Sequence, residues 1–145
     1  MSQQGYTEAP PDQATAGDLL VLLGREEKLI YLQPDDSLQT AAELFKKHGI
    51  SQVPVVDKGK IVGAIQEITI VHALHRGTSS PKVPLHEIMA RPMPQVEVRV
   101  LLEEVYRLLL AGNSGVAVVR EGRPIGLITR SDLMEYYDRV AMLKF

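Results

Sequence analysis

The chain has 145 residues, 45% of them hydrophobic and 5% aromatic, with a formal net charge of −2 and a pI near 6.1. This length suits one compact domain or two small units that share a core. The absence of cysteine excludes disulfides, thiolate metal sites and thiol nucleophiles, and the balanced charge offers no general attraction to nucleic acid or anionic lipid. No apolar run approaches membrane-spanning length and the opening residues lack the apolar core of a signal peptide, so we expect a cytoplasmic protein with a small-molecule ligand.

The first half of the chain predicts a strand, a helix, two strands and a helix, after a flexible segment at 1–14. The expected elements are a strand at 30–32, a helix opened by residues 36–39 that runs through residue 48, strands at 53–57 and 61–66, and a helix at 67–75. Gly49 stands where a left-handed C-terminal cap is expected, and Lys58-Gly59 forms the turn between the strands. The near-continuous apolar content of both strands indicates burial on two faces.

The second half of the chain predicts the same order of elements. The expected elements are a strand near Val96, a helix at 101–111, strands at 115–120 and 124–129, and a final helix that runs into the C-terminus. Residues 76–81 are rich in turn formers and are expected to be an exposed linker between the halves. The predicted domains are therefore 15–78 and 79–145.

An internal repeat relates the two halves. At an offset of 63 residues, Gly49, Ser51, Val53, Val55, Val56, Gly59, Val62, Gly63 and Ile65 align with Gly112, Ser114, Val116, Val118, Val119, Gly122, Ile125, Gly126 and Ile128. Every pair is identical except Val62 with Ile125, so the halves are diverged copies of one unit. A unit of about 60 residues is small for a core of its own. We therefore expect an α/β (α+β) fold of two β-α-β-β-α units packed with pseudo-twofold symmetry, with ligand sites in clefts between the copies.

The segment from Gly126 to Asp132 joins a predicted strand to a predicted helix. A helix N-terminus attracts anions, because its unbonded backbone N–H groups coincide with the positive end of the helix dipole. Thr129 adds a hydroxyl there, and the carboxylate of Asp132 can accept both hydroxyls of a ribose. A plain capping box, in which the two side chains satisfy only the first-turn N–H groups, explains the same residues equally well. Both interpretations stay open at this point.

The tandem order of elements, with Val53-Pro-Val-Val-Asp57 in one copy and Gly126-Leu-Ile-Thr-Arg-Ser-Asp132 in the other, resembles the CBS-domain family, whose paired domains are called a Bateman module. The resemblance covers the chain from about Thr15 onward. It implies a regulatory module, not an enzyme, that binds an adenosyl ligand such as AMP, ADP, ATP or S-adenosylmethionine.

Three further segments are similar to the C-terminal regulatory region of bacterial cystathionine β-synthase-like proteins: Thr15 to Leu20, Met93 to Val96 and Leu108 to Asn113. This similarity implies control of an attached or associated pyridoxal-phosphate enzyme. Met1 to Tyr6 is then the remnant of a catalytic domain's last segment, or the start of a stand-alone module; both alternatives stay open.

The family pattern implies specific ligand contacts in the second copy. Asp132 matches the acid that holds the ribose hydroxyls, Thr129 matches the hydroxyl that contacts phosphate or the adjoining sugar, and Gly126 permits close backbone approach. Arg130 can meet a phosphate, which favours a nucleotide over a sulfonium ligand, although an exposed helix arginine is an equal explanation. The family's adenine pocket corresponds to apolar residues for which core packing is the alternative role: Met93, Pro94, Val96, Val116, Ala117 and Ile128.

The first copy departs from this motif, because Gln66 replaces the threonine and Thr69 replaces the acid. A threonine cannot chelate two ribose hydroxyls as a carboxylate does, and Glu67 would repel a phosphate. We therefore expect a weak or empty site in the first copy and one principal site per chain.

Other side-chain groups favour neither a metal site nor catalysis. His72 and His75 are three apart on a predicted helix, but no acid or third histidine is spaced to complete a metal site. Ser79 and Ser80 have no histidine base at a recognisable spacing. We therefore expect no catalytic residues, no metal and no cofactor.

The predicted helix at 101–110 is apolar over more than one face, which indicates burial within the module or a homodimer contact. The resemblance favours the homodimer, to which Tyr136, Tyr137 and Met142 can add. Two other functions stay open: a dimerisation module with degenerate ligand sites, and a stand-alone nucleotide sensor that acts on another protein.

Overall fold

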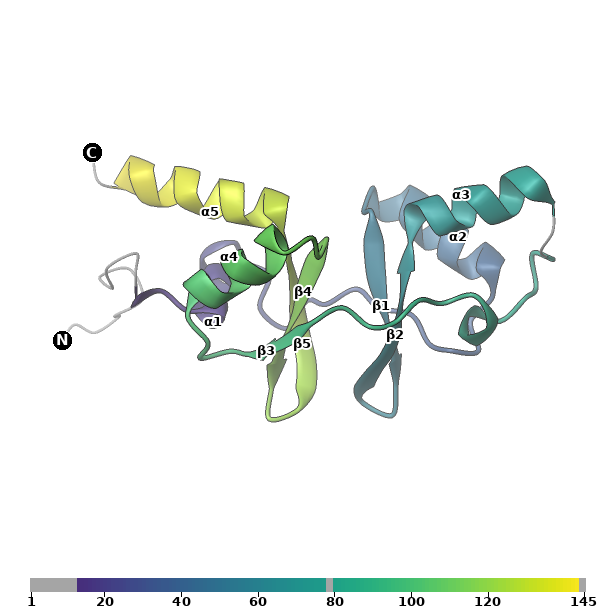
Figure 1. The fold of residues 1–145 in the computed structure, drawn as a ribbon, viewed down its shortest axis with the longest axis horizontal. Helices are drawn as coiled ribbons and strands as arrows, with labels where there is room; N and C mark the ends of the chain where they lie inside the picture. Colours follow the sequence, from purple (N-terminus) through teal and green to yellow (C-terminus); the bar gives the residue numbers. More distant parts are fainter. Residues whose placement is uncertain (1–12, 78–79, 144–145) are drawn as a thin grey trace. The chain divides into compact units, whose positions relative to one another are not determined.

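The computed structural model describes residues 13–77 and 80–143 (Figure 1). In chain order its elements are α1 (Ala16–Leu22), α2 (Leu38–His48), β1 (Gln52–Asp57), β2 (Lys60–Gln66), α3 (Glu67–Arg76), the 3₁₀ helix η3 (Leu85–Glu87), β3 (Gln95–Glu97), α4 (Leu102–Leu110), β4 (Gly115–Arg120), β5 (Arg123–Thr129) and α5 (Arg130–Leu143). The predicted α/β class is confirmed, and the predicted helices and strands differ from these bounds by a residue or two in most cases. Within the described ranges, no helix is both long and apolar enough to cross a bilayer.

The described residues form two compact units that do not coincide with the two repeats. Residues up to Leu29 and from Pro94 onward form one unit, and residues from Ile30 to Met93 form the other. The predicted domains, 15–78 and 79–145, follow the repeat instead. The difference arises because α1 contacts α4, α5 and β5 of the second repeat, whereas Leu85 in η3 lies in the core of the first repeat.

Most of the expected flexible segment 1–14 lies outside the described residues. Its last residue, Ala14, is buried, and its carbonyl accepts a hydrogen bond of 2.8 Å from the backbone N–H of Leu102.

The unit from Ile30 to Met93 is built on an antiparallel hairpin of β1 and β2, with Val53 opposite Ile65. The strand predicted at 30–32 is reduced to a single parallel bridge between Leu32 and Val55. Leu32 donates to the carbonyl of Pro54 at 3.1 Å and accepts from the backbone N–H of Val56 at 2.7 Å. The next bonds of a parallel ladder would need the N–H of Pro54 on one side of this bridge and that of Pro34 on the other, and proline has none. The two prolines therefore limit the pairing to one residue.

The helix α2 confirms the predicted cap positions. The hydroxyl of Ser37 accepts a hydrogen bond from the backbone N–H of Thr40, which satisfies one donor of the first turn. Gly49 ends the helix with φ of 62°, in the left-handed region that favours glycine.

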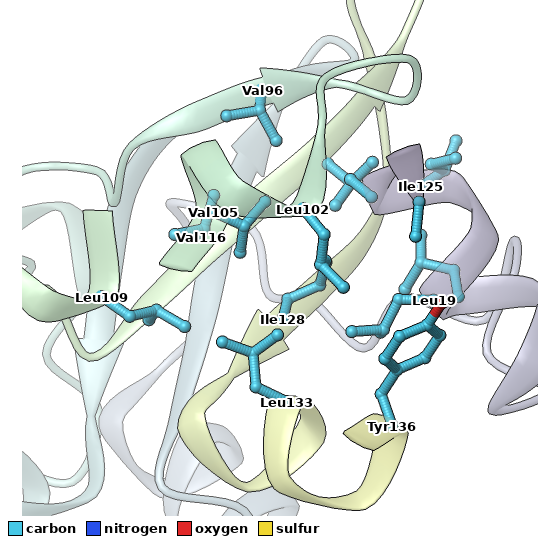
Figure 2. Close-up of a cluster of buried hydrophobic side chains, with 14 residues drawn as sticks. Leu19, Val96, Leu102, Val105, Leu109, Val116, Ile125, Ile128, Leu133 and Tyr136 are labelled. Carbon is cyan, nitrogen blue, oxygen red and sulfur yellow. The ribbon is translucent and has the colours of Figure 1, made fainter. Parts of the chain in front are cut away.

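The other unit contains a three-stranded sheet in the order β3-β4-β5, with β3 parallel and β5 antiparallel to β4. Side chains of α1, α4 and α5 pack with those of the sheet in one apolar cluster, part of which Figure 2 shows. Tyr136, expected at a dimer contact, is 5% exposed and belongs to this cluster. Burial raises the pKa of its phenol, so the ring stays uncharged in the core.

Equivalent glycines on β2 and β5 leave space for a segment that packs against each hairpin: η3 and the residues after it on β2, and α1 on β5. A Cβ at Gly126 would lie 2.7 Å from Cδ1 of Leu20 in α1, and a Cβ at Gly63 would overlap the side chain of Met89, just after η3. These segments also pair with equivalent positions, since Thr15 bridges Leu101 before α4 and Pro84 bridges Ser37 before α2. The repeat therefore extends to segments that the sequence analysis did not assign to elements.

Candidate functional site

The candidate site lies at the N-terminus of α5, in the unit that contains the second repeat. β5 ends at Thr129 and α5 begins at Arg130, so the predicted strand-to-helix junction is confirmed. Asp132 lies in the first turn of α5 and is 3% exposed. A carboxylate at this end of a helix is stabilised by the helix dipole, which helps to compensate for its burial.

Thr129 and Asp132 form reciprocal hydrogen bonds. Oδ2 of Asp132 accepts from the backbone N–H of Thr129 at 2.9 Å and from its hydroxyl at 3.1 Å. The backbone N–H of Asp132 in turn donates to the hydroxyl oxygen of Thr129 at 3.4 Å. This is the geometry that the capping-box interpretation requires.

The second carboxylate oxygen of Asp132 is in a different environment. Oδ1 accepts from Nη1 of Arg25 in an ion pair between residues 107 positions apart. The side chain of Asp132 is 4% exposed and that of Arg25 is 50% exposed. The ion pair therefore joins a buried anion to a cation that water reaches.

The segment that carries Arg25 is held to the same unit by further ion pairs. The backbone N–H of Arg25 donates to the carbonyl of Leu20 at 2.8 Å. Arg120 on β4 donates to Glu26 and to Glu27, each at 2.8 Å. The hydrogen bond to Glu26 raises the pKa of Arg120. These contacts connect the backbone next to Arg25 with β4 and with the end of α1.

Arg130 lies beside Thr129 in sequence, but its guanidinium has a structural partner. Nη2 donates to the carbonyl of Leu109 at 3.1 Å, near the C-terminus of α4, where cations satisfy carbonyls that lack helical partners. A phosphate contact by Arg130 stays a prediction, and it would compete with this hydrogen bond.

The remaining predicted ligand residues are in packed surroundings. Val96, Val116 and Ile128 belong to the apolar core (Figure 2), and the space beside Gly126 is occupied by Leu20. The predicted adenine pocket has three further members. Met93 and Ala117 are buried. Pro94 is half-buried, and its carbonyl accepts a hydrogen bond of 2.8 Å from the backbone N–H of Ala117. Core packing accounts for the burial of Val96, Val116 and Ile128, whereas Met93 and Ala117 are buried outside both apolar clusters. Adenine contact stays a prediction for all of these residues.

Sequence reasoning did not identify Arg25 as a site residue. Local spacing carries no signal for it, because its partner is 107 positions away and α1, which precedes it, was not expected.

In the first repeat, Gln66 occupies the N-cap position of α3 and its side chain makes no capping hydrogen bond, while Thr69 is half-buried. No carboxylate stands where Asp132 stands in the second repeat. In the described part of the chain, no group of three or more histidine, aspartate or glutamate side chains is arranged to hold a metal ion. A hollow of about 590 Å³ is lined by Glu97, Val98, Arg99, Arg120 and Glu121, and it does not include Asp132.

The chain is similar to known proteins in its family and in its fold. The family model described as CBS domain matches residues 25–76 and residues 85–139. An uncharacterized protein of Methanocaldococcus jannaschii is 26% identical over 106 residues, which are 72% of this chain; the chain spans only 34% of that relative's length.

Two solved structures cover nearly the whole chain. The Arabidopsis thaliana CBS-pair protein CBSX2, solved in complex with AMP, superposes with a TM-score of 0.70 at 22% identity, over 88% of this chain and 98% of that chain. The CBS domain pair of protein MJ0100, solved in complex with 5′-methylthioadenosine and S-adenosyl-L-methionine, superposes with a TM-score of 0.70 at 26% identity, over 87% and 97%.

Proposed function

We propose a function from the premise that this chain belongs to the CBS-domain family, of which it carries two domains in tandem. The chain is a regulatory module that binds an adenosine-containing ligand, AMP, ADP, ATP or S-adenosylmethionine, and thereby controls an attached or associated enzyme. One observation carries the proposal: a buried carboxylate at the N-terminus of α5 has one oxygen fixed by Thr129 and the other paired with a half-exposed arginine.

The chemistry of this corner suits a nucleoside. A carboxylate oxygen has two acceptor sites, so Oδ1 of Asp132 can receive hydroxyl donors from a ribose once Arg25 moves, while Oδ2 keeps its bonds to Thr129. The positive end of the α5 dipole favours a nearby phosphate. The complexes of the MJ0100 domain pair with two adenosyl compounds support the same ligand class for this chain.

Regulation requires that the ligand bind two arrangements of the protein with different affinities. We propose that the adenosyl ligand stabilises one arrangement of the module and so shifts the activity of the enzyme it controls. Our expectation that this enzyme is a cystathionine β-synthase stays a prediction, because none of the proteins named above is described as one. This prediction is tested by adding the module to the catalytic domain of a cystathionine β-synthase and measuring the rate of that enzyme with and without AMP.

Ligand binding is tested by comparing Asp132→Asn with Asp18→Asn. Asp18 makes the same reciprocal bonds with Thr15 at the start of α1, so both variants weaken a capping box, which is expected to lower the free energy of unfolding by up to about 1 kcal/mol. Asp132→Asn is expected to lose about 1 kcal/mol more, because it also removes the ion pair with Arg25. Only Asp132→Asn is expected to abolish the heat of binding and the increase in Tm with AMP, ADP, ATP or S-adenosylmethionine. Titration calorimetry and thermal unfolding provide both measurements.

Failure of the unmodified chain to bind any of these ligands at millimolar concentration would contradict the proposal. That outcome would favour the second candidate, a dimerisation module with degenerate ligand sites. The observation favouring that candidate is that protein groups already engage both oxygens of Asp132. The dimerisation module is distinguished by an oligomeric state that neither the ligands nor Asp132→Asn change.

A further inference from the structure

We propose that Arg25 is a specificity-determining residue, which opposes adenosyl ligands that lack a phosphate and favours those that carry one. The inference rests on the proposed function, because it concerns the ligand that binds at Asp132. It follows from the ion pair between Arg25 and Asp132 and from the anchoring of the backbone around Arg25.

Protein groups use most of the acceptor capacity of Asp132. Oδ2 already accepts two hydrogen bonds from Thr129, and Oδ1 accepts from Nη1 of Arg25. A carboxylate offers about four acceptor sites, so the two hydroxyls of a ribose cannot both reach Oδ1 while the guanidinium holds it. A bound ribose must therefore displace the Arg25 side chain.

The displaced guanidinium stays near the ligand. The backbone of Arg25 is bonded to Leu20, and the next two residues are paired with Arg120, so the side chain can swing while its Cα stays in place. The side chain is half-exposed, which leaves room for a change of rotamer. The guanidinium consequently stays within a side chain's reach of the ligand's ribose.

Adenosyl ligands differ in the charge that they offer to the displaced guanidinium. Displacing Arg25 breaks an ion pair with a nearly buried carboxylate, and a ligand phosphate can replace it with a bidentate, charge-assisted contact. Adenosine offers the displaced cation no anion. S-adenosylmethionine offers one carboxylate beside two cationic groups, so its net positive charge still repels the guanidinium. Arg25 therefore lowers the affinity for both of these ligands relative to AMP.

The test is titration calorimetry of the full chain with AMP and with adenosine, in the unmodified protein and in Arg25→Gln. We expect Arg25→Gln to bind adenosine more tightly and AMP more weakly, so that the ratio of the adenosine Kd to the AMP Kd falls by about tenfold, the equivalent of one charge-assisted hydrogen bond. Arg25→Lys keeps a cation but not the planar fork, and its ratio is expected to lie between the two.

Two control variants separate a specific effect from loss of charge. Arg107→Gln removes an equally charged side chain from an exposed pair with Glu103 on α4, and it is expected to leave the ratio unchanged. Arg130→Gln controls for the predicted phosphate contact of Arg130, whose guanidinium donates to the carbonyl of Leu109 near the end of α4; a fall of the ratio in this variant alone would assign the selectivity to Arg130.

An unchanged ratio in Arg25→Gln would overturn the inference, as would equal tightening of both ligands or a fall of the ratio in Arg130→Gln alone. Each of these results still includes binding by the unmodified chain, so it leaves the proposed function intact. Failure of the unmodified chain to bind any adenosyl ligand would instead overturn both proposals.

Discussion

Asp18 in α1 and Asp132 in α5 make the same reciprocal hydrogen bonds with a threonine three residues earlier. The hydrogen bonds alone therefore do not distinguish a cap from a ligand site. Asp132 differs because it is more deeply buried and because Arg25 pairs with its second oxygen. At the scale of single residues, the ion pair is the feature that makes Asp132 a candidate for ligand binding.

A double-mutant cycle of Arg25→Gln and Asp132→Asn measures this ion pair without any ligand. Because Asp132 is buried and Arg25 is half-exposed, the expected coupling in the free energy of unfolding is about 1 kcal/mol. The exposed pair of Glu103 and Arg107, at 3.4 Å on α4, should show only about 0.3 kcal/mol in a parallel cycle. Equal couplings in chemical denaturation would mean that Arg25 does not hold Asp132 persistently in solution.

The residues of the site were predictable from sequence to different degrees. Thr129 and Asp132 were placed correctly at the start of α5, because a strand pattern changes to a helix pattern in consecutive residues. Arg25 was not, because only the folded chain brings it to Asp132. The partner of Arg130, the carbonyl of Leu109, could not be inferred for the same reason.

At the scale of elements, the long helices and the hairpins follow from local patterns, whereas α1 depends on distant contacts. α1 is seven residues long, a length that is marginal for an isolated helix, and its second residue is Gly17. The backbone N–H groups of Ala16 and Gly17 each donate at 2.9 Å, to the carbonyls of Val100 and Val98. The helix is therefore stabilised by a segment about 80 residues away, which no local pattern reveals.

Gly126→Ala tests how closely α1 packs on β5. The added methyl would lie 2.7 Å from Cδ1 of Leu20, which is fully buried, so the expected loss in the free energy of unfolding is about 1–3 kcal/mol. Leu20→Ala alone should cost about 2–5 kcal/mol through the cavity it leaves. In the double variant the losses should not add, because the methyl at 126 fills part of that cavity. Strictly additive losses in urea denaturation would contradict this packing.

At the scale of the whole molecule, exposed apolar side chains are the feature that internal packing leaves unexplained. On α3, Ile68, Val71 and Leu74 follow at three-residue spacing and are 64%, 52% and 56% exposed. On α5, Tyr137 and Met142 are also exposed, as a dimer contact requires, whereas Tyr136 is buried in its own unit. The internal repeat predicts the fold of each unit. It carries no information about which surface contacts a second copy of the chain.

The homodimer contact predicted at residues 101–110 stays a prediction, and we propose that the apolar stripe on α3 also lies in a homodimer contact. Covering water-exposed apolar side chains with a second surface lowers the free energy of the complex. A charge introduced there would have to be desolvated, which costs free energy. Ile68→Glu combined with Val71→Glu is therefore expected to raise the dimer Kd by at least about a hundredfold, as measured by light scattering during size-exclusion chromatography. Gln39→Glu on the exposed face of α2 is the control, and it should leave the Kd unchanged. A monomeric unmodified chain at high concentration, or a dimer that the double substitution leaves intact, would rule out α3 as the contact.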